Sequence, residues 1–405
     1  MKSDNITTDN SMTNNNNKYS PELRFPEFQN SKKWEIEVIK NICDICTGKS
    51  NTQDQVKDGE YPFFIRSKVP VKSKKYLFDC EAVITIGDGK IGQVYHYVTG
   101  KFDLHQRCYK MSNFRKVMGK YFYYYFSSHF YERAMKMTAK ATVDSVRLEM
   151  IADMPFLLPS FLEQKKIADC LSSLDIYLDT TKRKLELLKE YKKGLMQQLF
   201  PRNGKNVPEL RFPEFTGEWA EKRLGDSFKE RKEKNRNDLP LLSLGEKGLL
   251  YQSDTNRKDN SNTDKSKYLR IALGDIAYNT MRMWQGRCVF VDKEGIVSPA
   301  YTVCQPKEGI DSMFHYYLFK THKMIEKFHR NSQGLVSDTL NLKFETFSKI
   351  KYFLPPSLTE QKKIADFLSK LDELIISESQ QLEALNAHKN GLMQRLFPKI
   401  STQDL

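Results

Sequence analysis

The sequence predicts an α+β protein with a pseudo-twofold internal repeat, in which a long antiparallel two-helix coiled coil separates two mixed α/β regions. Two duplicated stretches and one helical period support this fold class. PELRFPEF stands at Pro21–Phe28 and again at Pro208–Phe215, and EQKKIAD stands at Glu163–Asp169 and again at Glu360–Asp366. Seven identical residues do not recur 197 positions apart by chance, so the chain contains a duplication.

The duplication extends further, but only at the ends of each half. PSFLEQKKIADCLSSLD (159–175) matches PSLTEQKKIADFLSKLD (356–372), and KGLMQQLFP (193–201) matches NGLMQRLFP (390–398). The long regions 36–154 and 220–353 share no obvious identity. We therefore expect a disordered polar tail (1–20), a first variable domain (21–158) and a first repeated helix (159–201). A linker with a second variable domain (202–355), a second repeated helix (356–399) and a short tail (400–405) follow.

The repeated segments are predicted to be the two helices of the coiled coil. Their seam residues are spaced alternately four and three apart, a 3.5-residue period held for more than four heptads. The apolar seam positions are Ile167, Leu171, Leu174, Leu178, Leu185, Leu188, Leu195, Leu199, Ile364, Leu368, Leu371, Ile375, Leu382, Leu385, Leu392 and Leu396. Each segment follows a proline and stops at a Phe-Pro pair, where proline blocks continuation. Chain order makes such a pair antiparallel. The alternative is two amphipathic helices packed on separate cores, and the strict seven-residue period argues against it.

The variable regions have the patterns of mixed α/β domains. Alternating β-prone runs predict strands at 81–86, 93–98 and 107–111 in the first region, and at 275–280 and 287–291 in the second. The aromatic segments 120–135 and 312–328 predict buried helices in matching places. The two regions are therefore expected to share a fold without sharing sequence.

Several short motifs resemble functional sites. GDGKIG (87–92) fits GxGxxG, but the following QVYHYV alternates like a strand, so a β-hairpin turn is favoured over a dinucleotide site. CDIC (43–46) has no second ligand pair for zinc and no βαβ pattern beside it, so reduced, buried structural thiols are expected. The [D/N]PP[Y/F] tetrapeptide of DNA methyltransferases, the P-loop, HExxH and GxSxG are all absent. We therefore predict no catalytic residues, no metal site and no cofactor in this chain.

The charge balance favours an anionic partner. The net charge is +14, and both variable regions contribute: residues 21–155 hold 22 basic and 16 acidic side chains, and residues 208–352 hold 25 and 20. A basic surplus attracts polyanions such as DNA. The sequence has no apolar run of the roughly 18 residues that a membrane span needs, and its N-terminus does not resemble a signal peptide. We expect a cytoplasmic protein with no membrane partner.

Several loops carry side chains suited to DNA. NTMRMWQGR (279–287) follows a predicted strand, and arginine pairs with guanine while asparagine or glutamine pairs with adenine in the major groove. HQR (105–107) offers similar groups in the first region, and the segments 137–145 and 331–341 follow the two aromatic helices. For each loop the alternative is a solvated turn. The candidate DNA-binding residues are Arg66, Lys68, Lys90, His105, Gln106, Arg107, Lys140, Thr142, Asn279, Arg282, Trp284, Gln285, Arg287, Gln333, Ser337 and Thr339.

Taken together, the duplicated RFPEF, the EQKKIAD…GLMQxLFP helices and the two unlike basic regions resemble the specificity subunit of a type I restriction–modification system. The resemblance covers nearly the whole chain after the first twenty residues. It implies that each variable region is a target recognition domain, which reads one half of a bipartite site in double-stranded DNA. It implies that the helices set the spacer and dock two modification (methyltransferase) subunits, with restriction subunits joining the full complex. S-adenosylmethionine, ATP and Mg²⁺ would then act on those partner subunits.

Two other functions stay open at this point. One is a stand-alone DNA-binding or architectural protein without a methyltransferase partner. The other is a scaffold whose two modules bind protein ligands, which predicts weak salt dependence of any DNA binding.

Overall fold

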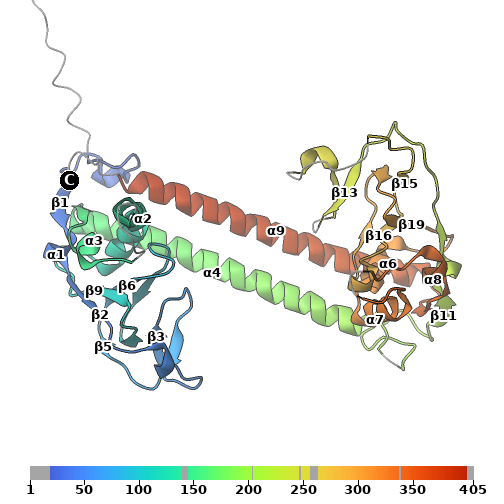
Figure 1. The fold of residues 1–405 in the computed structure, drawn as a ribbon, viewed down its shortest axis with the longest axis horizontal. Coiled ribbons are helices and arrows are strands. Elements are labelled where there is room, and N and C mark those ends of the chain that lie inside the picture. The colour runs from blue at the N-terminus through green and yellow to red at the C-terminus, as the bar shows by residue number, and fades with distance from the viewer. Residues whose placement is uncertain are drawn as a thin grey trace, which may run out of the picture. The chain divides into compact units, whose positions relative to one another are not determined.

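The chain divides into two compact units, which are described separately. The computed structural model describes residues 19–138, 145–202, 204–245, 248–255, 263–336 and 339–398. Unit 1 comprises Met1–Lys182 and Gln381–Leu405, and unit 2 comprises Arg183–Gln380. The boundaries between the units fall inside the two long helices, α4 (Phe161–Gln198) and α9 (Leu358–Leu396) (Figure 1). Each unit therefore contains a variable region and a part of both helices.

Unit 1 contains two four-stranded sheets. The first has the order β2-β9-β6-β7 and is antiparallel throughout; the second has the order β4-β3-β8-β5, with β3 parallel to β8. Strands β1 and β10 form a separate antiparallel pair. The strands are β1 Glu35–Val38, β2 Asp44–Thr47, β3 Tyr61–Phe64, β4 Val71–Ser73, β5 Phe78–Asp79, β6 Ala82–Ile86, β7 Tyr95–Val98, β8 Lys101–Leu104, β9 Cys108–Ser112 and β10 Pro155–Leu158, and the shorter helices are α1 Ile39–Ile42, α2 Gly119–Thr138 and α3 Leu148–Ala152.

Unit 2 repeats the main sheet of unit 1. Its four-stranded sheet has the order β12-β19-β16-β17, again antiparallel, and β11 pairs with β20 as β1 pairs with β10. The smaller sheets β13-β14 and β15-β18 complete the unit. The strands are β11 Ala220–Arg223, β12 Phe228–Glu230, β13 Leu242–Gly245, β14 Gly248–Tyr251, β15 Leu269–Ile271, β16 Ile276–Asn279, β17 Cys288–Phe290, β18 Gly295–Val297, β19 Tyr301–Pro306 and β20 Lys351–Leu354, and the shorter helices are α5 Leu224–Ser227, α6 Ser312–Phe319, α7 His322–Asn331 and α8 Phe344–Lys349. The prediction that the two variable regions share a fold is confirmed.

The aromatic helix α2 lies in the main core of unit 1. Phe122 and Phe126 stack one turn apart with ring centroids 5.6 Å from each other, and Phe126 stacks on Phe130 at 4.6 Å. Their side chains are fully buried. Burial of each such ring is worth about 1.5–3 kcal/mol, so the helix is held by packing and is not an exposed binding stripe.

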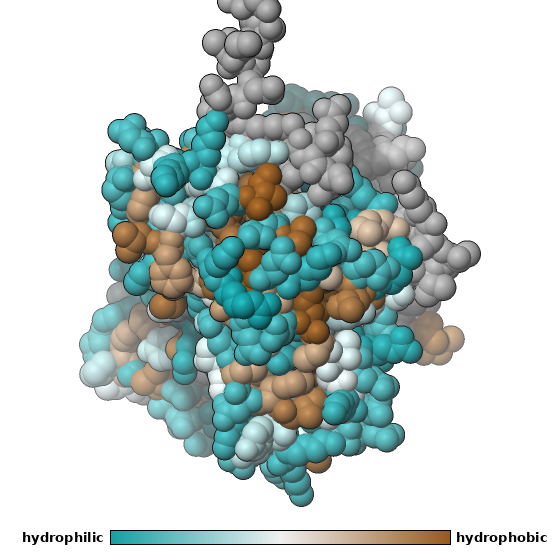
Figure 2. Space-filling view, turned by 90° about the vertical axis from the view of Figure 1, so that its left-hand side faces the viewer, coloured by the Kyte–Doolittle hydropathy of each residue, from teal (hydrophilic) through white to brown (hydrophobic). Residues whose placement is uncertain are grey.

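Figure 2 shows one face of the molecule, on which hydrophilic residues predominate and hydrophobic ones lie in small groups between them.

The corresponding segment of unit 2 differs from the prediction. A single helix was expected over 312–328, but the structure has two, α6 and α7, which are separated at Lys320 and Thr321. The Thr321 backbone is extended, and its hydroxyl accepts a hydrogen bond from the Met324 amide at 3.4 Å. Threonine is a good N-cap, so it begins a new helix where the aromatic pattern alone predicts continuation. The strand predictions for both regions are confirmed within two residues.

The 3.5-residue seam is buried as predicted. Every seam position of α4 and α9 is buried or partly buried, including the polar Thr181, Lys192, Glu378 and Lys389. Within unit 2, Lys184 pairs with Glu378 and Lys192 pairs with Asp372. Residue numbers therefore rise along α4 while those of the paired residues fall along α9. Within unit 1, the start of α4 packs against the end of α9 in the same core. Both parts are antiparallel pairs.

The helix ends follow their sequence signals. Ser160 and Ser357 each accept a hydrogen bond from the amide three residues on, at 3.3 Å, and so cap the starts of α4 and α9. In unit 1 the Leu23 amide donates to the Arg395 carbonyl oxygen at 2.9 Å. The first described residues of the chain therefore lie beside the end of α9, as chain order predicts. Among the described residues, no helix is long and apolar enough to cross a membrane.

Candidate nucleic-acid interface

In unit 1, the predicted DNA-binding loops converge at one end of the main sheet. Strands β6 and β7 form a hairpin whose connection contains GDGKIG, which confirms the hairpin interpretation of that motif. The Gly87 amide donates to the Arg107 carbonyl oxygen at 2.7 Å, and Gly87 accepts from the Val146 amide at 2.7 Å. Arg66 reaches the same connection and pairs with Asp88 at 3.2 Å. Four segments that are distant in sequence thus form one surface.

In unit 2, the hairpin connection between β16 and β17 occupies the equivalent place. Thr280 accepts a hydrogen bond from the Leu342 amide at 2.8 Å, which ties this connection to the segment after α7. The Trp284 indole donates to the Met281 carbonyl oxygen at 3.0 Å, and its ring meets His329 edge-on at 5.7 Å. The connection is therefore held to its scaffold by contacts within unit 2.

The two units share one structural feature at these loops. In each unit, the connection after the equivalent strand of the main sheet, β6 or β16, accepts a hydrogen bond from a backbone amide in the segment that follows the aromatic helix. The acceptor is the carbonyl oxygen of Gly87 in unit 1 and of Thr280 in unit 2. The side chains around that bond differ. Unit 1 presents Asp88 and Lys90, and unit 2 presents Arg282 and Gln285. The scaffold is common to both units and the exposed chemistry is not.

Most candidate residues are accessible. Arg66, Lys68, Lys90, Gln106, Arg107, Gln285, Arg287, Gln333 and Thr339 are exposed, while Asn279, Arg282 and Trp284 are partly exposed. The candidates Lys140, Thr142 and Ser337 lie outside the described residues. The role of each of these residues in DNA binding stays a prediction.

His105 is buried, which changes its expected role. Its side chain is only 4% exposed, its Nδ1 accepts a hydrogen bond from the Arg107 amide at 3.0 Å, and its other ring nitrogen lies 3.4 Å from the Thr52 hydroxyl. Burial, and secondly the charge of Arg66, lower the pKa of His105, so the ring is neutral at pH 7. We therefore expect His105 to position Gln106 and Arg107 and not to touch a base.

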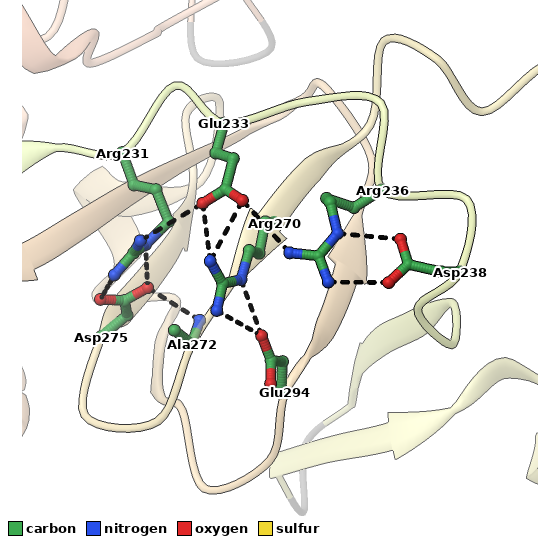
Figure 3. A network of polar contacts seen from close by, with 8 residues as sticks. All are labelled: Arg231, Glu233, Arg236, Asp238, Arg270, Ala272, Asp275 and Glu294. Carbon is green, nitrogen blue, oxygen red and sulfur yellow. Dashed lines mark hydrogen bonds and ion pairs between the residues drawn. The ribbon is translucent and has the colours of Figure 1, made fainter.

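Unit 2 contains an ion-pair network that the sequence did not predict (Figure 3). Arg231 pairs with the buried Asp275 at 2.7 Å, and Arg270 pairs with Glu233 at 2.8 Å and with Glu294 at 2.6 Å. Arg236 joins it through Glu233 and Asp238. These arginines are paired with carboxylates and brace the loop before β13 against β15, β16 and β18. The network holds three arginines and four carboxylates, so these arginines are structural and the basic surplus of this region comes from other residues.

The repeated motifs meet each other inside each unit. Arg24 of the first RFPEF forms two hydrogen bonds to Glu163 of the first EQKKIAD, at 2.7 and 2.8 Å, and Arg211 binds Glu360 at the same two distances. Both carboxylates are 1% exposed. The neighbouring Gln164 accepts from the Met118 amide at 2.9 Å, next to the start of α2. The repeated residues therefore connect the helices to the variable regions.

A second polar cluster is also repeated. In unit 2, Asp372 accepts from the Tyr317 hydroxyl at 2.8 Å and from the Lys192 ammonium. In unit 1, Asp175 accepts in the same way from Tyr124, at 2.6 Å, and from Lys389. Each cluster joins α4, α9 and the aromatic helix of its unit. The polar seam lysines thus specify the alignment of the helices, a known role for polar groups in coiled coils.

The cysteines are all free thiols, as the sequence predicts for a reduced protein. Cys43, Cys108, Cys288 and Cys304 are buried, and burial raises the pKa of the Cys43 thiol to about 12. The second cysteine of the CDIC motif, Cys46, is exposed. The prediction of a buried structural thiol is therefore wrong for Cys46. In the part of the chain that the structure describes, no group of three or more His, Cys, Asp or Glu side chains could hold a metal ion.

Comparison with known proteins assigns the family. The sequence model of the type I restriction modification DNA specificity domain matches the chain twice, over residues 31–190 and 216–387. The chain belongs to this family. The two specificity domains coincide with the two halves of the internal repeat, so the resemblance seen in the sequence is confirmed.

Relatives of this specificity-domain protein agree with the assignment. The type I restriction enzyme MjaVIII specificity subunit of Methanocaldococcus jannaschii is 32% identical over 211 residues, which are 51% of this chain and 47% of that protein. A putative MjaX specificity subunit of the same organism is 26% identical over 93% of this chain and 97% of its own length. The crystal structure of the S subunit from M. genitalium superposes with a TM-score of 0.65 at 17% identity, covering 94% of this chain and all of that one, and so shows the same fold.

Proposed function

We propose that this chain is the DNA-recognition subunit of a type I restriction–modification complex, and that each unit reads one half of an asymmetric bipartite site. The observation that carries the proposal is the repeated loop geometry. An equivalent hydrogen bond, accepted by the Gly87 carbonyl oxygen in unit 1 and by the Thr280 carbonyl oxygen in unit 2, holds the hairpin in both units, while the exposed side chains beside it differ. Two copies of one scaffold with different surfaces suit two different half-sites.

The loop chemistry supports base readout in the major groove. Arg287 and Gln285 are exposed beside the partly exposed Asn279, and Arg107 and Gln106 are exposed in unit 1. Arginine can form paired hydrogen bonds with guanine, and glutamine or asparagine with adenine. The lysines beside them suit phosphates, which position a protein without specifying sequence.

The helices would set the distance between the half-sites and dock two modification subunits. The buried seam runs through both α4 and α9, and a stiff spacer makes the separation of two binding modules a geometric constant. A duplicated chain presents equivalent surfaces twice, which suits two copies of one partner. Methyl transfer with S-adenosylmethionine, and ATP- and Mg²⁺-dependent steps, would take place on the partner subunits, and this chain would be non-catalytic and cytoplasmic.

A methylation map tests the proposal. The chain would be co-expressed with its candidate modification subunit in a methylation-free host, and adenine methylation would be located by single-molecule sequencing. We expect one asymmetric motif in two parts, methylated once in each part. A folded complex that leaves the DNA unmethylated would contradict the proposal and favour a stand-alone binding protein.

A further inference from the structure

Unit 2 contains a long groove with an apolar floor and basic sides. It lies between the last turns of α4 and the helix α7, and encloses about 970 Å³. Its floor includes Phe200, Leu318 and Met324, which are buried, and the partly exposed Met196 and Phe353. This space is far larger than a single phosphate ion needs, and it is in the upper part of the range for drug-sized ligands.

The sides of the groove are strongly cationic. Seven lysines and arginines line it, against one glutamate, Glu326. Lys189 and Lys193 are exposed on α4, one turn apart, and Lys320 is exposed on the opposite side before α7. Among the described residues, neither Lys189 nor Lys193 forms an ion pair, and both are exposed, so both ammonium groups can meet a ligand.

The groove is stabilised without a ligand. Lys323 donates to the carbonyl oxygens of Pro201 and Arg202 at 3.3 and 3.2 Å, which ties α7 to the end of α4. Lys327 donates to the Lys351 carbonyl oxygen. These two lysines build the walls. Lys189 and Lys193 on the rim supply the free charge, while Lys320 donates a hydrogen bond to the Tyr316 hydroxyl.

Unit 1 has different groups at the equivalent positions. The helix repeat, with its offset of 197, places Asn386 and Asn390 where unit 2 has Lys189 and Lys193. Counting from the paired tyrosines Tyr124 and Tyr317, Ser127 stands where unit 2 has Lys320. A partner that bound both halves alike would need similar groups in both. The basic groove therefore suits a partner that binds once per chain.

We propose that this groove binds one acidic amphipathic helix of a protein partner, with apolar side chains on the floor and carboxylates against the lysine rows. Charge complementarity selects the acidic helix, and the apolar floor selects a protein over DNA, whose backbone offers phosphates but no apolar ridge. The stretch of α4 from Lys189 to Gln197 spans roughly 12 Å, so about two turns of the bound helix would cover it. This is the helix-in-groove mode of recognition.

The test measures peptide binding to the full chain, without DNA or other subunits. The probe is a fluorescein-labelled 15-residue helical peptide with leucines along one face and glutamates on both sides of that face. We expect saturable binding in fluorescence anisotropy, with protection of His322–Asn331 in hydrogen exchange. The double variant Lys189→Glu/Lys193→Glu should weaken binding at least tenfold.

Three controls make the result decisive. The variant Lys182→Glu/Arg183→Glu reverses two exposed charges elsewhere on α4 and should change binding less than twofold. A peptide with serines in place of the leucines should bind at least tenfold more weakly. A 20-base-pair DNA duplex should not displace the leucine peptide. Failure of the leucine peptide to bind, equal losses in both variants, equal binding of the serine peptide, or displacement by DNA would each overturn the proposal. Peptide binding does not require DNA recognition, so it fails or succeeds separately from the proposed function.

Discussion

The Arg211 guanidinium lies 2.7 and 2.8 Å from the two carboxylate oxygens of Glu360, and the Trp219 indole donates to the same carboxylate at 3.2 Å. Arg211 belongs to the second RFPEF and Glu360 to the second EQKKIAD, 149 residues apart. The two most similar stretches of the repeat are therefore partners. The presence of this arginine and this glutamate in both halves is explained by an ion pair that each half forms.

Removing this arginine should destabilise unit 2. Arg211→Ala leaves the Glu360 carboxylate buried and short of its charged partner, and breaking a buried pair from one side costs roughly 3–5 kcal/mol. Chemical denaturation followed by fluorescence checks this value. Arg202→Ala is the matched control, since its pair with Glu209 is exposed and should contribute at most about 1 kcal/mol. Equal losses in the two variants would show that the buried pair has no special importance.

The helix seam provides a second pair of variants. Leu185 is 6% exposed and Leu187, two residues on, is 56% exposed. Leu185→Ala should cost about 2–4 kcal/mol by leaving a cavity between the helices, and Leu187→Ala should cost less than about 0.5 kcal/mol. Thermal and chemical denaturation of the two variants measures the difference. If Leu187→Ala were as damaging as Leu185→Ala, the seam would not be what holds the helices together.

The amount that could be predicted from sequence depended on the range of the interactions. The seam could be predicted because a heptad period is local, and Leu171 and Leu368 could be assigned to it by spacing alone. The pairing of Arg24 with Glu163 could not, because the partners are 139 residues apart and neither residue type signals burial. The network around Arg231 and Arg270 was missed for the same reason, since its members come from several loops and strands.

The candidate site followed the same rule. The hairpin at GDGKIG was predicted by alternation and by glycine, and it is present, whereas in unit 2 only the two strands of the hairpin were predicted. The burial of His105 could not be predicted, because its neighbour Thr52 comes from a distant segment. The break before α7 was missed because the capping bond of Thr321 competes with an aromatic pattern that favours helix.

The polar cluster at Asp372 gives a third prediction. Asp372→Ala removes the acceptor of Tyr317 and the partner of Lys192, which is only 19% exposed, and hydrogen bonds to charged groups contribute about 1.5–3 kcal/mol. Asp175→Ala should have a similar effect, since its cluster in unit 1 has the same members. Asp366→Ala, at an exposed position of α9, should stay within about 0.5 kcal/mol. Denaturation midpoints of the three variants test this, and an unaffected Asp372→Ala would contradict the assigned role.

Acid should destabilise unit 2 through His315. This side chain is fully buried, one ring nitrogen lies 2.7 Å from the Asp311 carbonyl oxygen and the other lies 2.9 Å from the Tyr352 hydroxyl. Burial lowers the pKa of His315 to about 4 from an ordinary 6.5. Between pH 6.5 and about pH 4, the unfolded chain therefore binds a proton at His315 that the folded chain does not bind. The contribution to stability is complete above pH 6.5 and is lost as the pH falls toward 4.

The size of this effect is roughly 3 kcal/mol, from about 1.4 kcal/mol per pKa unit. Denaturation at several pH values between 7 and 4 would measure the slope. His315→Phe should flatten the slope, because phenylalanine does not titrate. Phenylalanine is the replacement chosen because unit 1 has Phe122 at the equivalent position. His322→Phe, at a position that is 86% exposed, should leave the slope unchanged. An unchanged slope in His315→Phe would assign the acid sensitivity to other groups.

Base recognition gives the last prediction, and it rests on the proposed function. Arg107→Ala in unit 1 and Arg287→Ala in unit 2 each remove an exposed guanidinium from the candidate loops. If each arginine pairs with a guanine, its loss should weaken binding by about 1–3 kcal/mol, and only at the half-site that its own unit reads. Binding would be measured on duplexes in which one half-site or the other is scrambled, once the methylation map has defined both. A loss of equal size on every duplex, together with a smaller salt dependence, would instead assign the arginine to a phosphate. The two variants control for each other, because a general folding defect would affect both half-sites together, whereas base readout must separate them.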